Sequence, residues 1–254
     1  MNHEHVLALF DRELRREAAP DGPGAEVERA GDIVRHVGPG HGWNGVLWSD
    51  LDADRADAAI AEQVRYFGAL GRAFEWKLYG HDGPADLDRR LLAAGFVAEP
   101  AETLMVAEAA AVAGEVVLPE GVRLVPVTGP EGVEPAARVH ELAFGSGDHI
   151  RERLPEQLAA GSVVAVLAMA GDVPVSAARM DLHPGTRFAS LWGGGTAPEW
   201  RGRGVYRALV AHRAREAVAR GYRYLQVDAS SQSRPILERL GFAPLTTTTP
   251  YLHA

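Results

Sequence analysis

The sequence predicts an α/β protein with a mixed, largely antiparallel sheet flanked by helices. Two observations in the second half of the 254-residue chain predict this class. Short apolar runs bounded by Gly and Pro are typical of strands, and the segment from residue 205 to 220 has the 3.6-residue period of a helix. The predicted elements are a strand at 122–127, a helix at 134–144, strands at 163–170, 175–181 and 188–194, a helix at 205–220 and a strand at 224–227.

A glycine-rich turn connects the predicted strand at 188–194 to the predicted helix at 205–220. Gly202 and Gly204 lie where the helix begins, and Gly221 is a typical C-cap at its end. Without a Cβ atom, the first two glycines let a ligand approach backbone N–H groups at the positive end of the helix dipole. Arg201 and Arg203 add charges that suit phosphate oxygens. The turn therefore predicts a pyrophosphate-binding site.

Two common phosphate motifs do not fit this turn. The dinucleotide fingerprint requires a third Gly where this chain has Arg207, and the Walker loop requires a Gly-Lys-Ser/Thr sequence that does not occur. The turn instead resembles the Gln/Arg-x-x-Gly-x-Gly/Ala signature of the GNAT-type N-acetyltransferases. Arg201 stands first and Gly204 fourth, although Tyr206 replaces the small sixth residue. As in that superfamily, a strand and a short helix ending in Gly-Phe follow, and the resemblance extends over residues 121–252.

The resemblance implies the fold of that superfamily and a direct transfer of acetyl from acetyl-CoA to the amine of a small molecule inside a ternary complex. It places the pyrophosphate of coenzyme A on the turn and pairs the pantetheine arm, like a strand, with the residues just before it. The implied cofactor-binding residues are Thr196, Ala197, Arg201, Gly202, Arg203, Gly204, Val205 and Tyr206.

The catalytic residues depart from the superfamily pattern. The tyrosine that commonly acts as general acid is replaced by Leu237, which we predict to be an apolar helix residue without a chemical role. Asp228 ends the preceding strand and is either a candidate general base or an ordinary strand-end carboxylate. Ser231 or Ser233 could hydrogen-bond the cofactor or cap the helix that follows. These departures leave a second hypothesis open, a non-catalytic acyl-CoA-binding or interaction protein.

An internal repeat predicts two tandem domains. Residues 87–96 and 236–242 each predict a short helix that closes on Gly-Phe. No comparable glycine turn belongs to the first copy, which is therefore expected to be degenerate. An Ala-rich stretch between the copies is typical of a linker. We expect a degenerate domain at 1–106, a linker at 107–120 and a catalytic domain at 121–254; the alternative is that the repeat reflects two unrelated helix C-caps.

Composition narrows the class of protein further. The chain has no cysteine, which excludes disulfides, thiolate metal sites and a cysteine acyl-enzyme. Its formal net charge of −8 argues against a general nucleic-acid binder, and its scattered histidines lack the spacing of a zinc site, so no metal is expected. No apolar run reaches the ~18 residues of a membrane span. We therefore expect a cytoplasmic enzyme that acts on a small molecule. We expect neither nucleic acid nor a membrane as its partner, and the sequence is compatible with a homodimer.

Overall fold

The computed structural model describes residues 1–40 and 42–254, which divide into two compact units. Unit 1 comprises Met1–Met105, Asp228–Leu237 and Pro244–Ala254, and unit 2 comprises Val106–Val227 and Glu238–Ala243. The first segment of unit 1 ends at Met105, one residue before the end of the first domain expected from the sequence. The two segments near the C-terminus differ from the expectation, because they group with unit 1 and not with the residues that precede them. Neither unit is therefore one continuous stretch of chain.

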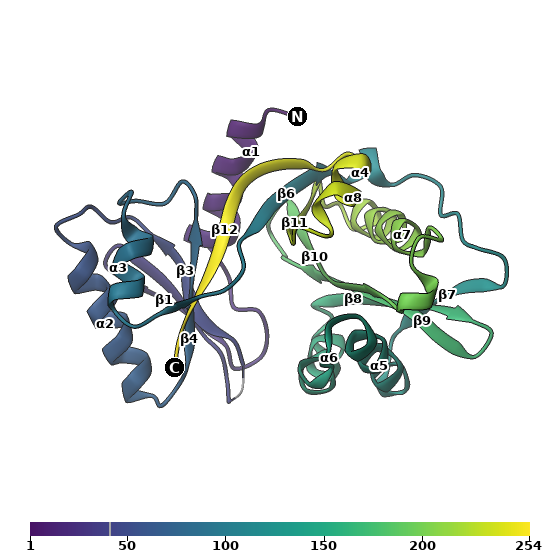
Figure 1. Ribbon diagram of the computed structural model, residues 1–254, viewed down its shortest axis with the longest axis horizontal. Coiled ribbons are helices and arrows are strands. Elements are labelled where there is room, and N and C mark those ends of the chain that lie inside the picture. Colours follow the sequence, from purple (N-terminus) through teal and green to yellow (C-terminus); the bar gives the residue numbers. More distant parts are fainter. Residues whose placement is uncertain (41) are drawn as a thin grey trace. The chain divides into compact units, whose positions relative to one another are not determined.

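Unit 1 contains a sheet with the strand order β1-β2-β3-β4-β12, in which only β3 and β4 are parallel (Figure 1). The last strand of the chain, β12, is thus hydrogen-bonded to β4, and β5 adds a two-residue pairing on it. The elements of this unit are α1 (His3–Phe10), η1 (Asp11–Arg16), β1 (Glu26–Ala30), β2 (Ile33–Val37), β3 (Asn44–Ser49), α2 (Ala56–Ala69), β4 (Phe74–Tyr79), α3 (Leu87–Ala93) and β5 (Val97–Ala98). Elements that cross or lie near the boundaries are β6 (Glu102–Glu108), α8 (Arg234–Arg239) and β12 (Ala243–His253).

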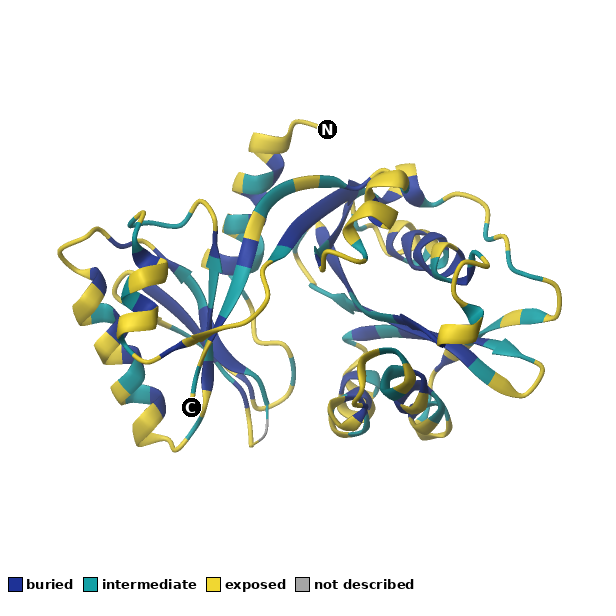
Figure 2. Ribbon diagram, viewed as in Figure 1, coloured by how far each residue is buried: buried dark blue, intermediate teal, exposed yellow. Residues whose placement is uncertain are grey.

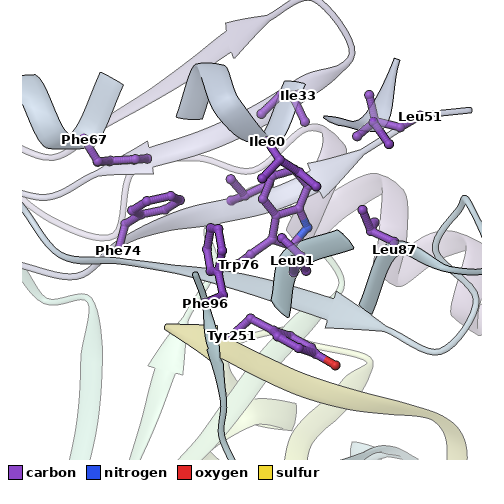
Figure 3. Close-up of a cluster of buried hydrophobic side chains, with 12 residues drawn as sticks. Ile33, Leu51, Ile60, Phe67, Phe74, Trp76, Leu87, Leu91, Phe96 and Tyr251 are labelled. Carbon is purple, nitrogen blue, oxygen red and sulfur yellow. The ribbon is translucent and has the colours of Figure 1, made fainter. Parts of the chain in front are cut away.

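The core of unit 1 is an aromatic cluster that Figure 3 shows in close-up. Phe67 of α2 stacks on Phe74 of β4 with ring centroids 4.4 Å apart, and Phe96 meets Phe74 edge-on. Phe96 follows Gly95, whose left-handed φ of +93° ends α3, and the same arrangement recurs at Gly241, with a φ of +96°. Tyr251 of β12 completes this core, so the end of the chain contributes apolar area to the fold of its beginning.

Unit 2 contains the strand order β11-β10-β9-β8-β7, antiparallel except between β10 and β11. This is the mixed, largely antiparallel sheet that the sequence predicts. Helices α5 and α6 cover one face and α7 the other, and Figure 2 shows buried residues along the strands and exposed ones on the outer sides of the helices. Its elements are α4 (Ala109–Val112), β7 (Val122–Val127), η2 (Pro130–Gly132), α5 (Val133–Phe144), α6 (Asp148–Ala160), β8 (Val163–Ala170), β9 (Val173–Leu182), β10 (Phe188–Thr196), η3 (Pro198–Trp200), α7 (Val205–Ala219) and β11 (Tyr224–Ala229).

Alternation along β8 and β9 explains the two layers of unit 2. Ala165 and Ala177 point toward α5 and α6, whereas their neighbours Val166 and Ala178 pack against α7. Both faces of these strands are covered, which is why their sequences are nearly continuous apolar runs. Within the described part of the chain, no helix combines the length and apolar character that a membrane crossing needs.

Candidate functional site

The turn before α7 has the backbone geometry of an anion site. Gly202 and Gly204 adopt left-handed φ values of +73° and +86°, and Gly204 is the N-cap of α7 without any side-chain cap. The first bond inside the helix runs from the Ala208 N–H to the Gly204 carbonyl over 3.0 Å. The N–H groups of the preceding helical turn have no carbonyl partner within the helix and point out of its positive end.

Guanidinium groups surround this turn. Arg201 donates through Nε to the Thr196 carbonyl over 3.1 Å, and the Arg203 guanidinium lies 4.8 Å from the centre of the Trp200 ring. A third group comes from Arg207, whose Nη2 lies 3.4 Å from where a Cβ atom on Gly204 would stand. In the sequence, Arg207 only excludes a dinucleotide motif and does not stand out as a ligand-binding residue. Its position one helical turn inside α7 brings it back over the turn, where it adds positive charge.

Beside the turn, β10 offers a strand edge that β11 does not cover. The two strands pair only from Phe188 to Ser190, while β10 continues to Thr196. Ala197 donates its N–H to the Val175 carbonyl on β9 over 2.9 Å, and its own carbonyl accepts the Trp200 N–H. Because hydrogen-bonded and non-bonded pairs alternate, the backbone groups of Thr196 point away from β9. The Thr196 N–H therefore has the geometry to pair with an extended ligand arm, while its carbonyl already accepts from Arg201. Ala197, which is also expected to pair, has both backbone groups engaged.

Three successive glycines bring two helices close to β10. The register with β9 shifts between Trp192 and Gly195, and Gly193 within this bulge has a φ of +56°. A Cβ on Gly195 would lie 2.7 Å from the Cβ of Ala143 on α5, and one on Gly194 would lie 2.8 Å from the Tyr206 ring on α7. Side chains at these positions would push the helices away. The apolar pattern predicts only a strand here, and the bulge is a feature that the structure adds.

On the α5 face of the bulge lies a pair of histidines that sequence reasoning also missed. His140 holds its Nδ1 2.5 Å from the Ser146 carbonyl oxygen, and its Cδ2–Nε2 edge lies 3.7 to 3.9 Å from where a Cβ on Gly193 would stand. The ring of His149, on α6, meets the His140 ring edge-on with centroids 4.5 Å apart. The available signal was the tight loop between α5 and α6, which brings the two helix ends together.

Burial and positive charge keep these histidines neutral. Burial lowers the pKa of His140, the Ser146 carbonyl partly opposes this, and Arg179 lowers the pKa further. Arg179 comes from β9, and its Nη1 lies 3.9 Å from the same Cβ position on Gly193. His149 is exposed as a whole, but partial burial of its ring and the charges of His140, Arg179 and Arg153 together lower its pKa to about 4. Both rings are therefore unprotonated at neutral pH.

On the α7 face, Tyr206 lies over Gly194 and beside a buried arginine. Arg213 is 1% exposed and donates to the carbonyl oxygens of Leu209 and Arg179 over 3.2 and 2.9 Å. Burial lowers its pKa to about 10, against the opposing effect of Tyr206. Burial raises the pKa of Tyr206, so its phenol stays protonated. Tyr206, which stands where the acetyltransferase motif has a small residue, thus packs on the glycine bulge.

The catalytic candidates near the C-terminus, Asp228, Ser231 and Ser233, belong with Leu237 to unit 1. The Asp228 carboxylate is 2% exposed and lies 2.7 Å from Nζ of Lys77 on β4. Burial alone would lower the pKa of Lys77, but the attraction of Asp228 outweighs it and the pKa is raised. Asp228 is therefore an ion-paired carboxylate. Ser233 donates to the Ser230 carbonyl over 3.3 Å at the start of α8, Ser231 is exposed, and Leu237 is fully buried.

Residues 136–242 match the model of the acetyltransferase (GNAT) family. This stretch is a GNAT acetyltransferase domain. It contains the glycine turn, the β10 edge, the bulge and both histidines. No curated protein sequence matches the chain. A group of three or more side chains able to hold a metal ion is not found among residues 1–40 and 42–254.

Solved structures share the fold of the whole chain. A GCN5-related N-acetyltransferase from Kribbella flavida superposes with a TM-score of 0.72 at 20% identity, covering 98% of this chain and 95% of its own. A tandem GNAT protein from the clavulanic acid biosynthesis pathway gives 0.64 at 13% identity, covering 99% and 95%. A conserved protein of unknown function from Staphylococcus epidermidis gives 0.68 at 13%, covering 93% and 96%. At these identities the likeness establishes the tandem acetyltransferase fold and not a substrate.

Proposed function

We propose that this protein is an N-acetyltransferase that moves the acetyl group of acetyl-CoA directly to the amine of a small molecule in a ternary complex. The observation that carries the proposal is the uncapped N-terminus of α7, lined by two left-handed glycines within the residues that match the family. An anion bound there would meet unpaired N–H groups and the positive end of a helix dipole.

The residues present fit the diphosphate of coenzyme A. The backbone of residues 205–207 would donate hydrogen bonds, and Arg201 and Arg203 would add charge on the exposed side. The free edge of β10 at Thr196 would pair with the arm that carries the thioester. Acetyl-CoA supplies the activated acetyl group, and the protein has to position an amine against it and remove a proton.

The energetics of the two proton transfers agree with the missing tyrosine. An alkylamine with a pKa of ~10.4 is about 3.4 units from neutrality, so exposing its lone pair costs about 4.6 kcal/mol. A thiol leaving group with a cysteine-like pKa of ~8.5 is about 1.5 units away, or about 2 kcal/mol. A general acid therefore matters less than a base, and the buried Leu237 at the acid position is compatible with activity.

A second candidate function is non-catalytic acyl-CoA binding. It is favoured by the same Leu237 and by the engagement of Asp228 with Lys77. Incubating the protein with acetyl-CoA and a panel of amines, and following release of the CoA thiol, separates the two functions. Amine-dependent release supports the enzyme, whereas tight CoA binding without release for any amine supports the binding protein.

The placement of coenzyme A is tested by Gly204→Asp. This change sets a carboxylate and a Cβ where backbone must meet phosphate, and it should abolish CoA binding in calorimetry. Gly221→Asp is the matched control, because Gly221 follows the other end of α7 with a φ of +84°, close to the +86° of Gly204. Both variants carry the same backbone strain, so only Gly204→Asp should lose the ligand. Unchanged affinity in Gly204→Asp, or two CoA molecules per parent chain, would contradict the placement.

A further inference from the structure

On the α5 face of the β10 bulge, His140 carries a nitrogen atom with a fixed lone pair. The Ser146 carbonyl oxygen can only accept a hydrogen bond, so Nδ1 of His140 must carry the ring proton. In the neutral ring the lone pair is then on Nε2. This nitrogen lies 3.9 Å from the position that a Cβ on Gly193 would occupy. Gly193 is three residues from Thr196, or about 10 Å along the strand.

We infer that His140 is the general base that removes a proton from the acceptor amine. The inference rests on the proposed function and assigns the base to α5, in place of the Asp228 candidate. Four features of the structure support it. The tautomer of His140 is fixed by a backbone carbonyl, Nε2 faces the bulge, Gly193 has no side chain between its backbone and Nε2, and β11 does not pair with β10 beyond Ser190.

The charged and titratable neighbours of His140 come from three elements. From β9 come Arg179 and its partner Asp181, which lie 3.5 Å apart. On α6, the His149 ring contacts His140, and Asp148 and Arg153 are charges that act on His149. Arg151, also on α6, is paired with Glu141 and Glu134 of α5 and with Asp148. Of these groups, the Arg179 guanidinium acts on the ring directly: it lowers the pKa of His140 and so favours the neutral imidazole that a base requires.

The proton balance of the reaction follows from this arrangement. Nε2 of His140 accepts one proton from the ammonium, which frees the nitrogen lone pair to bond to the acetyl carbon as the bond from that carbon to sulfur breaks. The new amide nitrogen releases a second proton when it becomes neutral. One proton goes to the departing thiolate through water, and the other leaves Nε2 for the solvent, so one proton is released in each turnover.

The test compares His140→Gln with the parent chain. Glutamine places an amide near the position of Nε2 but cannot take up a proton. With an alkylamine from the panel, kcat/KM of the parent should rise with pH through an inflection below the ordinary 6.5 of histidine. In His140→Gln, kcat should fall by about a hundredfold to ten-thousandfold, and this rising limb should disappear. With an arylamine, which is unprotonated at neutral pH, the fall in kcat of His140→Gln should be smaller.

His212→Gln is the matched control. His212 lies on α7, is half-buried, and also has a pKa lowered by burial, but it has no place at the bulge. Its variant should keep both the rate and the inflection. Nitrogen NMR of the parent should show a neutral His140 with its proton on Nδ1, and calorimetry should show CoA affinity unchanged in His140→Gln.

The outcomes separate this inference from the proposed function. If the parent turns over no amine, the proposed function fails and the inference falls with it. If the parent is active and His140→Gln retains its kcat and its rising limb, the inference alone is overturned. It is also overturned if the limb disappears in His149→Gln and persists in His140→Gln, because the base would then be the exposed neighbour.

Discussion

Replacing Asp228 by Asn decides whether this carboxylate serves the fold or the chemistry. In the structure its side chain is 2% exposed, and that of Lys77, 2.7 Å away, is 15% exposed. Asparagine has the same shape but removes the charge, which leaves the Lys77 ammonium largely desolvated without its closest partner. Lys77 lies on β4, in the middle of the unit 1 sheet between β3 and β12.

The expected loss of stability follows from the surroundings of this pair. Removing one partner of a buried ion pair costs about 3–5 kcal/mol. Lys77 also experiences the negative charges of Glu75 and Glu102, which remain in the variant, so the lower end applies. A loss of about 3 kcal/mol corresponds to a decrease in Tm of about 6–12 °C for a chain of this size.

Urea unfolding and hydrogen exchange of the β4 peptide measure this loss, and a double-mutant cycle with Lys77→Met isolates the pair. The double variant should be less destabilised than the sum of the single variants, because neither buried charge is then left alone. The kcat of folded Asp228→Asn should be close to that of the parent. A loss below about 1 kcal/mol together with a collapse of kcat would refute the structural role and restore Asp228 as a base.

Two further predictions concern stability. Burial lowers the pKa of His140 and His212, so protonation favours the unfolded chain, and the stability of unit 2 should be complete above pH ~6.5 and fall as the pH decreases toward their folded values. Urea titrations across this range check the sign, which is wrong if stability rises on acidification. Truncating the chain after Ala243 removes the partner of β4 together with Tyr251 from the core, so exchange protection of β4 should be lost. Full protection of β4 in the truncated chain would contradict the role of β12.

Local backbone rules explain what could be predicted from the sequence. The start of α7 at Val205 and the glycine turn before it follow from the conformational freedom of Gly202 and Gly204 and from helical periodicity. The burial of Leu237 follows from its place on the apolar side of a short helix. The mixed sheet of unit 2 likewise follows from strand and helix signals that each lie within about ten residues.

Contacts between distant residues could not be predicted in the same way. Lys77 and Asp228 belong to strands far apart in the chain, and the pairing of β12 with β4 depends on which free strand edge the end of the chain meets. The approach of His140 to Gly193 depends on the close packing of α5 against the glycine bulge. The sequence by itself determined the glycine turn before α7, because a turn is encoded by adjacent residues. Only the tertiary structure decided the position of His140 beside Gly193 and the place of the last strand, because packing and strand register are properties of the whole chain.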